Sequence, residues 1–204
     1  MRMRKKKHGT ERILACSEFF IKNRSEIEKF PIELEIGCGK GAFILWLAKR
    51  NPEKNYIAME KISDVILLAA EKLKDAEIKN VKLINGDASS LLEFFEKGEV
   101  DRIYLNFSDP WPKKGYYKRR LTYKGFLDIY KTILVPKGEI VLKTDNVGLF
   151  DYSLEQFEEA GFKLKELTRD LHNSEYAEDN IMTEYEKNFS EKGFSINRVI
   201  AYLE

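Results

Sequence analysis

The sequence Leu34-Glu-Ile-Gly-Cys-Gly-Lys-Gly41 lies where a predicted strand, Ile32–Ile36, gives way to a predicted helix, Ala42–Arg50. A strand that enters a helix through a glycine-rich turn is typical of the first unit of a doubly wound α/β fold. Glycine permits positive φ and lets the backbone approach a ligand at the carboxyl end of the strand. This turn therefore predicts both a fold class and a ligand site.

The alternation of strand and helix continues along the chain. Further strands are predicted at Asn55–Met59, Val81–Asn85, Val100–Phe107, Glu139–Lys143, Lys163–Thr168 and Asn197–Leu203. Further helices are predicted at Ser63–Ala76, Leu91–Lys97, Lys124–Leu134, Leu149–Ala160 and Thr183–Lys192, with one or two more within Glu11–Phe30. This pattern predicts an α/β fold with a mostly parallel seven-stranded sheet, helices on both faces and an antiparallel last strand.

Length and composition limit the class of protein. The 204 residues, 43% of them hydrophobic, predict a single domain over residues 11–204, preceded by a flexible basic tail over residues 1–10. No apolar run is long enough to span a membrane or resembles a signal peptide, so we expect a cytoplasmic protein. Two cysteines, Cys16 and Cys38, and two histidines, His8 and His172, give no disulfide or metal-ligand pattern. We therefore expect no metal, and the sequence is compatible with a monomer or a homodimer.

The net charge of +1, from 35 basic and 34 acidic residues, conceals an uneven distribution. Acidic residues dominate between Asp151 and Glu191, and a basic block lies within Lys113–Arg120. A second basic block comprises Arg2, Arg4, Lys5, Lys6 and Lys7. Binding to a polyanion requires a local patch rather than an overall excess of charge. The charge pattern is therefore compatible with RNA binding.

Two cofactors suit the glycine turn. Gly37, Gly39 and Ala42 satisfy the dinucleotide pattern, in which a pyrophosphate rests on the helix N-terminus. Gly37, Gly39 and Gly41, with Glu35 just before them, suit S-adenosylmethionine better, because an acidic strand end helps to bind its sulfonium and ammonium charges. The glycine turn by itself is weak support for either cofactor.

Two further acids lie at later strand ends. Glu60 follows the second predicted strand, where a carboxylate can accept hydrogen bonds from both ribose hydroxyls. Asp87 follows the third strand, within reach of an adenine amino group. Acids at three consecutive strand ends favour S-adenosylmethionine over NAD as the cofactor.

The fourth strand leads into Asn106-Phe-Ser-Asp-Pro-Trp-Pro-Lys-Lys-Gly-Tyr-Tyr-Lys-Arg-Arg120. Pro110 and Pro112 end the strand, because neither can donate a ladder hydrogen bond. The resulting stiff turn presents Asp109 and Trp111, and a rigid loop lowers the ordering cost of binding. A carboxylate and an aromatic ring beside a cationic strip suit a nucleobase whose phosphates lie alongside.

These motifs resemble those of the bacterial tRNA (guanine-N7)-methyltransferases. The resemblance rests on Leu34–Gly41, Glu60, Asp87, Asn106–Arg120, Lys143-Thr-Asp145 and Thr183-Glu-Tyr-Glu186. It implies a Rossmann-like class I methyltransferase fold, S-adenosylmethionine as the cofactor and tRNA as the partner. The implied reaction is methyl transfer to N7 of a guanosine, forming 7-methylguanosine.

The resemblance also implies roles for individual residues. Around the cofactor it places Glu35, Glu60, Asp87 and the catalytic Asp109, next to the turn glycines Gly37, Gly39 and Gly41. The implied guanosine contacts are Lys113, Asp145, Thr183, Glu184, Tyr185 and Glu186, and the implied RNA contacts are Gly115, Tyr116, Tyr117, Lys118, Arg119 and Arg120. The family often has arginine and histidines at positions 115–117, a difference that bears on RNA contacts and not on catalysis.

Guanine N7 carries an in-plane lone pair, so methyl transfer from a sulfonium requires no proton removal. Asp109 would then orient the substrate or stabilise charge. Asp145 and Glu186 could accept the N1 and N2 protons that distinguish guanine from adenine. Both acids also have structural explanations, since Asp145 could cap the next helix and Thr183-x-x-Glu186 fits a capping box.

Two other activities compete with this interpretation. Amino-group methyltransferases acting on adenine or cytosine carry an Asn/Asp-Pro-Pro-aromatic motif, but here Trp111 follows Pro110 directly. A non-catalytic RNA-binding protein could also retain a cofactor fold. The intact acids at three strand ends disfavour that second alternative.

Overall fold

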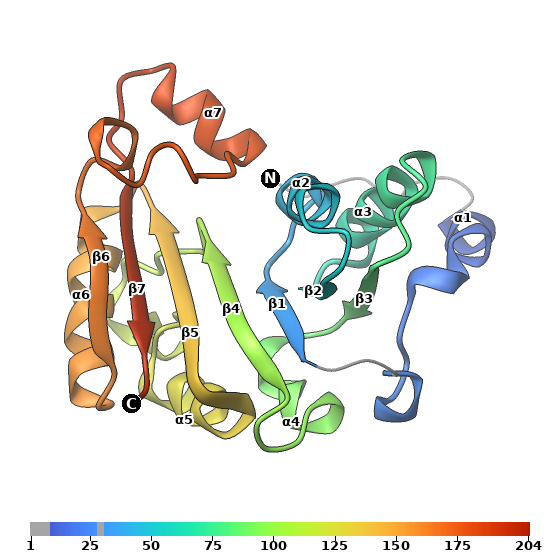
Figure 1. Ribbon diagram of the computed structural model, residues 1–204, viewed down its shortest axis with the longest axis horizontal. Coiled ribbons are helices and arrows are strands. Elements are labelled where there is room, and N and C mark those ends of the chain that lie inside the picture. Colours follow the sequence, from blue (N-terminus) through green and yellow to red (C-terminus); the bar gives the residue numbers. More distant parts are fainter. Residues whose placement is uncertain (1–8, 28–30) are drawn as a thin grey trace.

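The computed structural model describes residues 9–27 and 31–204, which form a seven-stranded sheet with flanking helices (Figure 1). The strands are β1 (Ile32–Ile36), β2 (Asn55–Glu60), β3 (Val81–Asn85), β4 (Val100–Asn106), β5 (Leu134–Thr144), β6 (Lys163–Thr168) and β7 (Asn197–Tyr202). Their order is β3-β2-β1-β4-β5-β7-β6. Neighbours among β1–β5 pair parallel, whereas β7 pairs antiparallel with both β5 and β6. The predicted sheet is confirmed.

Helices cover both faces of this sheet. They are α1 (Gly9–Ala15), α2 (Ala42–Arg50), α3 (Ser63–Asp75), α4 (Leu91–Phe94), α5 (Lys124–Ile133), α6 (Val147–Glu159) and α7 (Glu184–Ser190). One apolar cluster joins α2 and α3 to one face, and a second joins α4, α5 and α6 to the other (Figure 1). Within the described ranges, no helix is long and apolar enough to cross a membrane.

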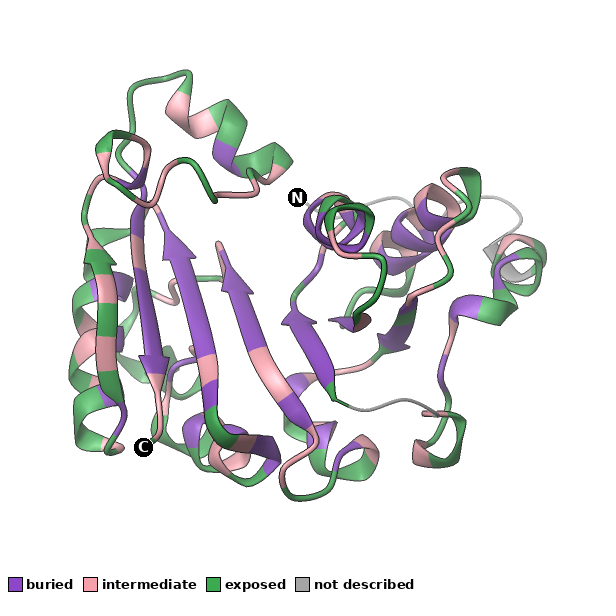
Figure 2. Ribbon diagram, in the orientation of Figure 1, coloured by how far each residue is buried: buried purple, intermediate pink, exposed green. Residues whose placement is uncertain are grey.

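The central strand β1 is buried along its whole length (Figure 2). Parallel strands covered on both faces read as apolar runs, so the two acids in β1 stand out. A buried carboxylate must be compensated by hydrogen bonds or opposite charge. Glu33 is compensated, because it accepts hydrogen bonds from Lys54 Nζ and Tyr104 Oη, both at 2.6 Å. Glu35 differs, as described below.

The prediction of one or two helices within Glu11–Phe30 was largely wrong. The chain forms α1, then two 3-10 turns at Ser17–Phe19 and Arg24–Glu26. Between the turns the chain extends along β3, where Ile21 N donates to Leu83 O at 2.9 Å. The spacing of the apolar residues gave the wrong prediction of a helix. Phe19 is buried on a 3-10 turn, and Ile21 is buried in the extended segment that pairs with β3 at the edge of the sheet. Most of the predicted tail, residues 1–8, lies outside the described part of the chain, and α1 begins at Gly9.

Gly41 offers a test of how closely the first turn packs. Its φ is +73°, and a Cβ placed there would lie 2.7 Å from Ala69 Cβ on α3. An alanine at this position would hold an unfavourable left-handed backbone conformation and would overlap with Ala69. We therefore expect Gly41→Ala to lower the free energy of unfolding by about 2–5 kcal/mol, which urea denaturation measures. Gly39→Ala is the control, because Gly39 shares the positive φ but no described atom lies within 4 Å of its Cβ position. An equal loss in both variants would contradict the packing argument.

Candidate cofactor and substrate site

The parallel strands bring the predicted site residues to one edge of the sheet. In Figure 1 the carboxyl ends of β2, β1, β4 and β5 lie side by side, at the edge that faces α7. Glu60 ends β2, Asn106 ends β4, and Asp145 directly follows β5. Sheet topology therefore brings Glu60 and Asp145, 85 positions apart in the sequence, to the same edge of the sheet.

Glu35 is a buried acid with one unsatisfied oxygen. Its Oε1 accepts a hydrogen bond from Asn106 Nδ2 at 3.1 Å. Among the residues that the structure describes, neither Glu35 Oε2 nor Asn106 Oδ1 has a hydrogen-bond partner. Burial raises the pKa of Glu35 to about 7, although the Asn106 hydrogen bond and the Lys143 charge oppose that shift. Two buried acceptors without donors indicate that a ligand with N–H groups fits here.

The glycine turn is held open by its neighbours. The backbone N–H groups of Gly37 and Cys38 both donate to Met59 O, at 2.8 and 3.1 Å. Glu60 Oε2 accepts from Gly39 N at 3.2 Å, and its Oε1 accepts from Ile62 N at 2.9 Å. Glu60 therefore fixes the glycine turn. It also ends β2, the position at which the sequence predicts a ribose-binding acid.

Asp87 forms hydrogen bonds and an ion pair that the sequence did not predict. Its Oδ1 accepts from Ser89 N at 3.1 Å, and its Oδ2 pairs with Lys61 Nζ at 2.7 Å. The hydrogen bond from Lys61 is the main cause of its lowered pKa. Asp87 is thus an ionised cap of the turn after β3, at the predicted place beside the site.

Asp109 projects from a strained loop. Phe107 and Trp111, on either side of it, have φ values of +53° and +41°. Bulky residues rarely adopt this region, and such strain persists only where the surroundings enforce it. Arg120 does so, since its Nε donates to Pro110 O at 2.9 Å and its Nη2 to Trp111 O at 3.3 Å. The Asp109 side chain is exposed and forms no hydrogen bond or ion pair within residues 9–27 and 31–204.

The predicted RNA-binding strip divides into two parts. Arg120 points into the Asp109 loop and stacks on the Tyr152 ring at 4.3 Å. Arg119 lies 4.8 Å from the ring centroids of both Trp111 and Tyr116. The other members of the strip are exposed, and its lysines form no ion pair with any described residue: Lys113, Lys114, Gly115, Tyr117 and Lys118. The strip therefore combines loop-holding arginines with free surface cations.

Asp145 is not the cap of α6. That position belongs to Asn146, whose side chain accepts from Leu149 N at 2.8 Å. The Asp145 carboxylate is half-buried and receives a long hydrogen bond, 3.4 Å, from Tyr185 Oη. The Tyr185 ring in turn lies between Phe107 and Phe189, at centroid distances of 5.0 and 4.2 Å. The structure thus brings the Asp109 loop, the β5 end and α7 into contact.

Glu186 is the most buried acid of the predicted substrate segment. It completes the expected capping box with Thr183. Its side chain has no exposed surface, and it accepts from Lys143 Nζ at 2.8 Å and Asn180 Nδ2 at 2.6 Å. His172 Nε2 lies 2.9 Å from Glu186 Oε1. Both oxygens are occupied, so in this arrangement Glu186 positions the segment instead of presenting a free acceptor to guanosine.

Comparisons with known proteins decide the family. A family model described as "Putative methyltransferase" matches residues 29–199. A curated tRNA (guanine-N(7)-)-methyltransferase of Bacillus cytotoxicus is 52% identical over 98% of this chain and 96% of its own length. The chain belongs to the tRNA (guanine-N7)-methyltransferase family.

Solved structures support the class I methyltransferase fold of this family member. The 16S rRNA methyltransferase KamB superposes with a TM-score of 0.63, covering 89% of this chain and 90% of its own, at 15% identity. A SAM dependent methyltransferase from Aquifex aeolicus superposes with a TM-score of 0.59, covering 95% and 90% of the two chains, also at 15% identity. At such identities the likeness establishes the fold alone.

The sequence-based prediction missed four residues that organise the site. Asn106 orients Glu35, and Lys143 joins the sheet to the α7 segment together with His172 and Asn180. The sequence did contain one indication of the Lys143 pair. A lysine inside the apolar part of β5 is buried and therefore requires an acidic partner. No sequence pattern indicated that the acid would be Glu186, 43 residues away.

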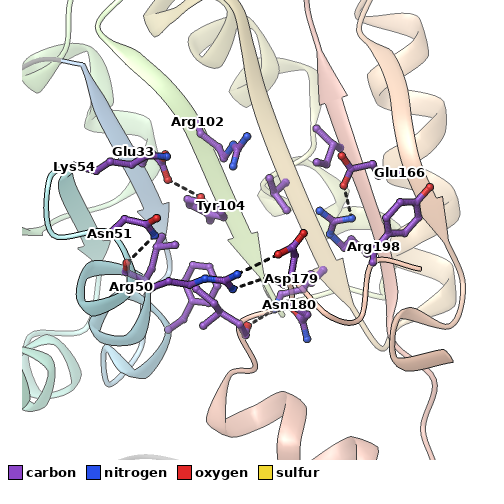
Figure 3. Close-up of a pocket in the computed structure, with 17 residues that line it drawn as sticks. Glu33, Arg50, Asn51, Lys54, Arg102, Tyr104, Glu166, Asp179, Asn180 and Arg198 are labelled. Carbon is purple, nitrogen blue, oxygen red and sulfur yellow. Dashed lines mark hydrogen bonds and ion pairs between the residues drawn. The ribbon is translucent and has the colours of Figure 1, made fainter. Parts of the chain in front are cut away.

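A separate cavity of about 340 Å³ lies over the part of the sheet that α2 and α3 leave uncovered (Figure 3). Its charged side chains pair with one another, as in Lys54–Glu33 at 2.6 Å and Arg50–Asp179 at 3.1 Å. Its lining includes Lys143 but not the glycine turn, Glu60, Asp87 or Asp109. This cavity is therefore not the strand-end site.

The two parts of the basic strip are expected to respond differently to mutation. Arg120→Lys keeps the charge but loses the fork that donates to Pro110 O and Trp111 O. Hydrogen bonds from charged groups contribute about 1.5–3 kcal/mol, so we expect a lower melting temperature and slower methyl transfer. Lys118→Ala should leave both unchanged and lower the log–log salt slope of tRNA binding by about 0.7–0.9.

Differential scanning fluorimetry, single-turnover kinetics and filter binding at several salt concentrations measure these effects. An Arg120→Lys variant whose melting temperature and single-turnover rate equal those of the wild type would show that the arginine fork does not hold the loop.

Proposed function

We propose that this protein transfers the methyl group of S-adenosylmethionine to N7 of a guanosine in tRNA. The observation that carries the proposal is the pair of buried acceptors without donors, Glu35 Oε2 and Asn106 Oδ1, beside an open glycine turn. Two buried acceptors next to a strained aspartate loop suit a cationic cofactor and a polar base.

The residues at the strand ends fit S-adenosylmethionine. An ammonium group provides three N–H donors and a positive charge, which match the acceptors of Glu35 and Asn106. The described chain leaves open space above Gly37 and Gly39, where a Cβ would meet no atom within 4 Å. Glu60 is proposed to hold the ribose and Asp87 the adenine. When bound, this cofactor supplies an electrophilic methyl group on a sulfonium.

The guanosine is proposed to bind between the Asp109 loop and α7. Asp145, half-buried after β5, is proposed to accept the N1 and N2 protons of guanine, a contact that adenine cannot make. Lys113 and the residues Thr183, Glu184 and Tyr185 complete this side of the site. Glu186 holds them in place through its buried pair with Lys143.

The tRNA backbone is proposed to bind along Gly115–Arg120. Lys118 is free to contact phosphate, and Tyr116 and Tyr117 are exposed rings on which a base can stack. Arg119, already between two rings, adds charge at the same surface. These side chains lie directly after the Asp109 loop, so RNA bound there reaches the strand-end site.

The proposed reaction requires only that N7, the methyl group and the sulfur are aligned and that a negative charge lies near the purine. N7 attacks with its own lone pair, so no side chain has to remove a proton. As the purine becomes cationic, the unpaired Asp109 carboxylate stabilises the growing charge or orients the base for in-line attack.

The identity of the product tests the function directly. Purified protein is incubated with labelled S-adenosylmethionine and an unmodified tRNA transcript, followed by nucleoside analysis. We expect 7-methylguanosine, whose cationic imidazole ring makes the chain cleavable by borohydride and then aniline. Label found only on an exocyclic amino group, in RNA resistant to that cleavage, would overturn the proposal.

Asp109→Asn keeps the shape of the side chain and removes its charge. We expect the single-turnover rate to fall about 100- to 1,000-fold, as is typical when one preorganised electrostatic group is lost. Binding of tRNA and cofactor should change little. Asp128→Asn is a matched control, because Asp128 lies on α5 and, among the described residues, its side chain pairs only with Lys124 on the same helix. A rate equal to that of the control would remove Asp109 from the reaction.

Glu35 makes cofactor binding pH-dependent. Its pKa of about 7 means that it is protonated in acid, whereas a bound cation favours the ionised form. Affinity should therefore rise with pH up to about 7 and then level off, with binding about tenfold weaker at pH 6 than at pH 8. Calorimetric titration between these pH values measures this, and Glu35→Gln should bind weakly without the pH dependence. A wild-type affinity that is flat over this range would contradict the assignment.

A further inference from the structure

A groove runs between α2 and the turn that precedes α7. One part, of about 180 Å³, is lined by residues that include Trp46, Met182 and Thr183. A second, more open part of about 570 Å³ is lined by Trp46, Lys49, Arg50, Ile181 and Met182. Trp46 and Met182 border both parts, so the groove is continuous from Thr183, in the proposed guanosine segment, outward along α2.

Trp46 lies off the buried face of its helix. Five of its neighbours on α2 are buried against the sheet or α3: Phe43, Ile44, Leu45, Leu47 and Ala48. Trp46, by contrast, is 58% exposed, and Met182 across the groove is 42% exposed. A tryptophan this exposed contributes little to the core, and with Met182 it leaves a flat apolar surface uncovered in the described chain.

The cations around the groove outnumber the acids available to them. Lys49 Nζ lies over the Trp46 ring at 5.5 Å, and neither Lys49 nor Lys187 forms an ion pair with any residue in the described ranges. The acids at the groove are already paired, Glu184 with Lys72 at 2.7 Å and Asp179 with Arg50 at 3.1 Å. An aromatic platform flanked by unpaired lysines matches a nucleotide, whose base stacks and whose phosphate needs a cation.

The wall of the groove is fixed in place. Lys143 Nζ donates to Asn180 Oδ1 at 3.0 Å and to Ile181 O at 2.8 Å, which anchors the turn just before Met182. The other wall is α2, whose N-terminus follows the glycine turn. A preformed surface loses little entropy on binding, so it can add affinity for a substrate held next to it.

We infer that this groove binds an unpaired nucleotide of the tRNA next to the target guanosine, with its base stacked on Trp46 and its phosphate near Lys49 or Lys187. The inference rests on the proposed function, because it places this nucleotide beside a guanosine held at Thr183–Tyr185. It extends the proposed RNA-binding surface beyond Gly115–Arg120 to the groove beside α2.

Trp46→Ala tests the stacking contact. Loss of one base–aromatic stack should raise the Kd for an unmodified tRNA transcript about 5- to 150-fold. Trp46→Phe should retain most of the affinity, because a smaller ring still stacks. Lys49→Ala should lower the salt slope by about 0.7–0.9. Leu92→Ala is the control, since Leu92 is 54% exposed on α4, far from the carboxyl edge of the sheet.

Filter binding without cofactor gives the Kd, and calorimetry with S-adenosylmethionine checks that the cofactor site is intact. A Trp46→Ala variant that binds tRNA as tightly as Leu92→Ala overturns the inference. So does a variant whose only change is dissociation of a dimer, because the groove would then be an interface between copies.

The proposed function is tested separately by product analysis of the wild-type enzyme. If no 7-methylguanosine forms, the proposed function fails, while the binding data still decide whether the groove holds RNA. If it forms and Trp46→Ala binds normally, only the groove assignment is lost.

Discussion

A buried lysine at the end of β5 links the two halves of the site. The side chain of Lys143 is 3% exposed, and its three ammonium protons are used by Asn180 Oδ1, Ile181 O and Glu186 Oε2. Removing one partner of such a buried pair typically costs about 3–5 kcal/mol, because the other charge is left without compensation. The position of α7 relative to the sheet, and with it the proposed guanosine segment and the groove beside α2, depends on this contact.

The same lysine also faces Glu35 on the cofactor side. Its charge opposes the burial that raises the pKa of Glu35, as does the hydrogen bond from Asn106. Burial alone would also raise the pKa of Glu186, but Lys143, His172 and Asn180 outweigh it and lower that pKa. One acid is thus fully satisfied and structural, while the other retains a free oxygen. This asymmetry separates the acid that shapes the site from the one that is available to a ligand.

Strain in the Asp109 loop is offset by a second cation. Arg120 fixes the carbonyl groups of Pro110 and Trp111, so the two prolines and the arginine together define the loop. A loop ordered before binding presents Asp109 at a low entropic cost. Arginine suits this task better than lysine, because its planar fork serves two acceptors at once. The family motif therefore includes a residue that builds the loop as well as exposed cations such as Lys118.

Local sequence determined the elements, while tertiary structure decided how the charged side chains are used. Ile32–Ile36 was predictable to the residue, because its alternating apolar residues lead directly into the glycine turn that begins the first helix. The acids Glu35, Glu60 and Asp87 were predictable as a group, because parallel strands end at one edge. The Glu186–Lys143 pair, the Arg120 clamp and the edge pairing of Ile21 join residues far apart in sequence, which no local pattern encodes. Only the packed structure determines which charges find partners and which remain free for a ligand.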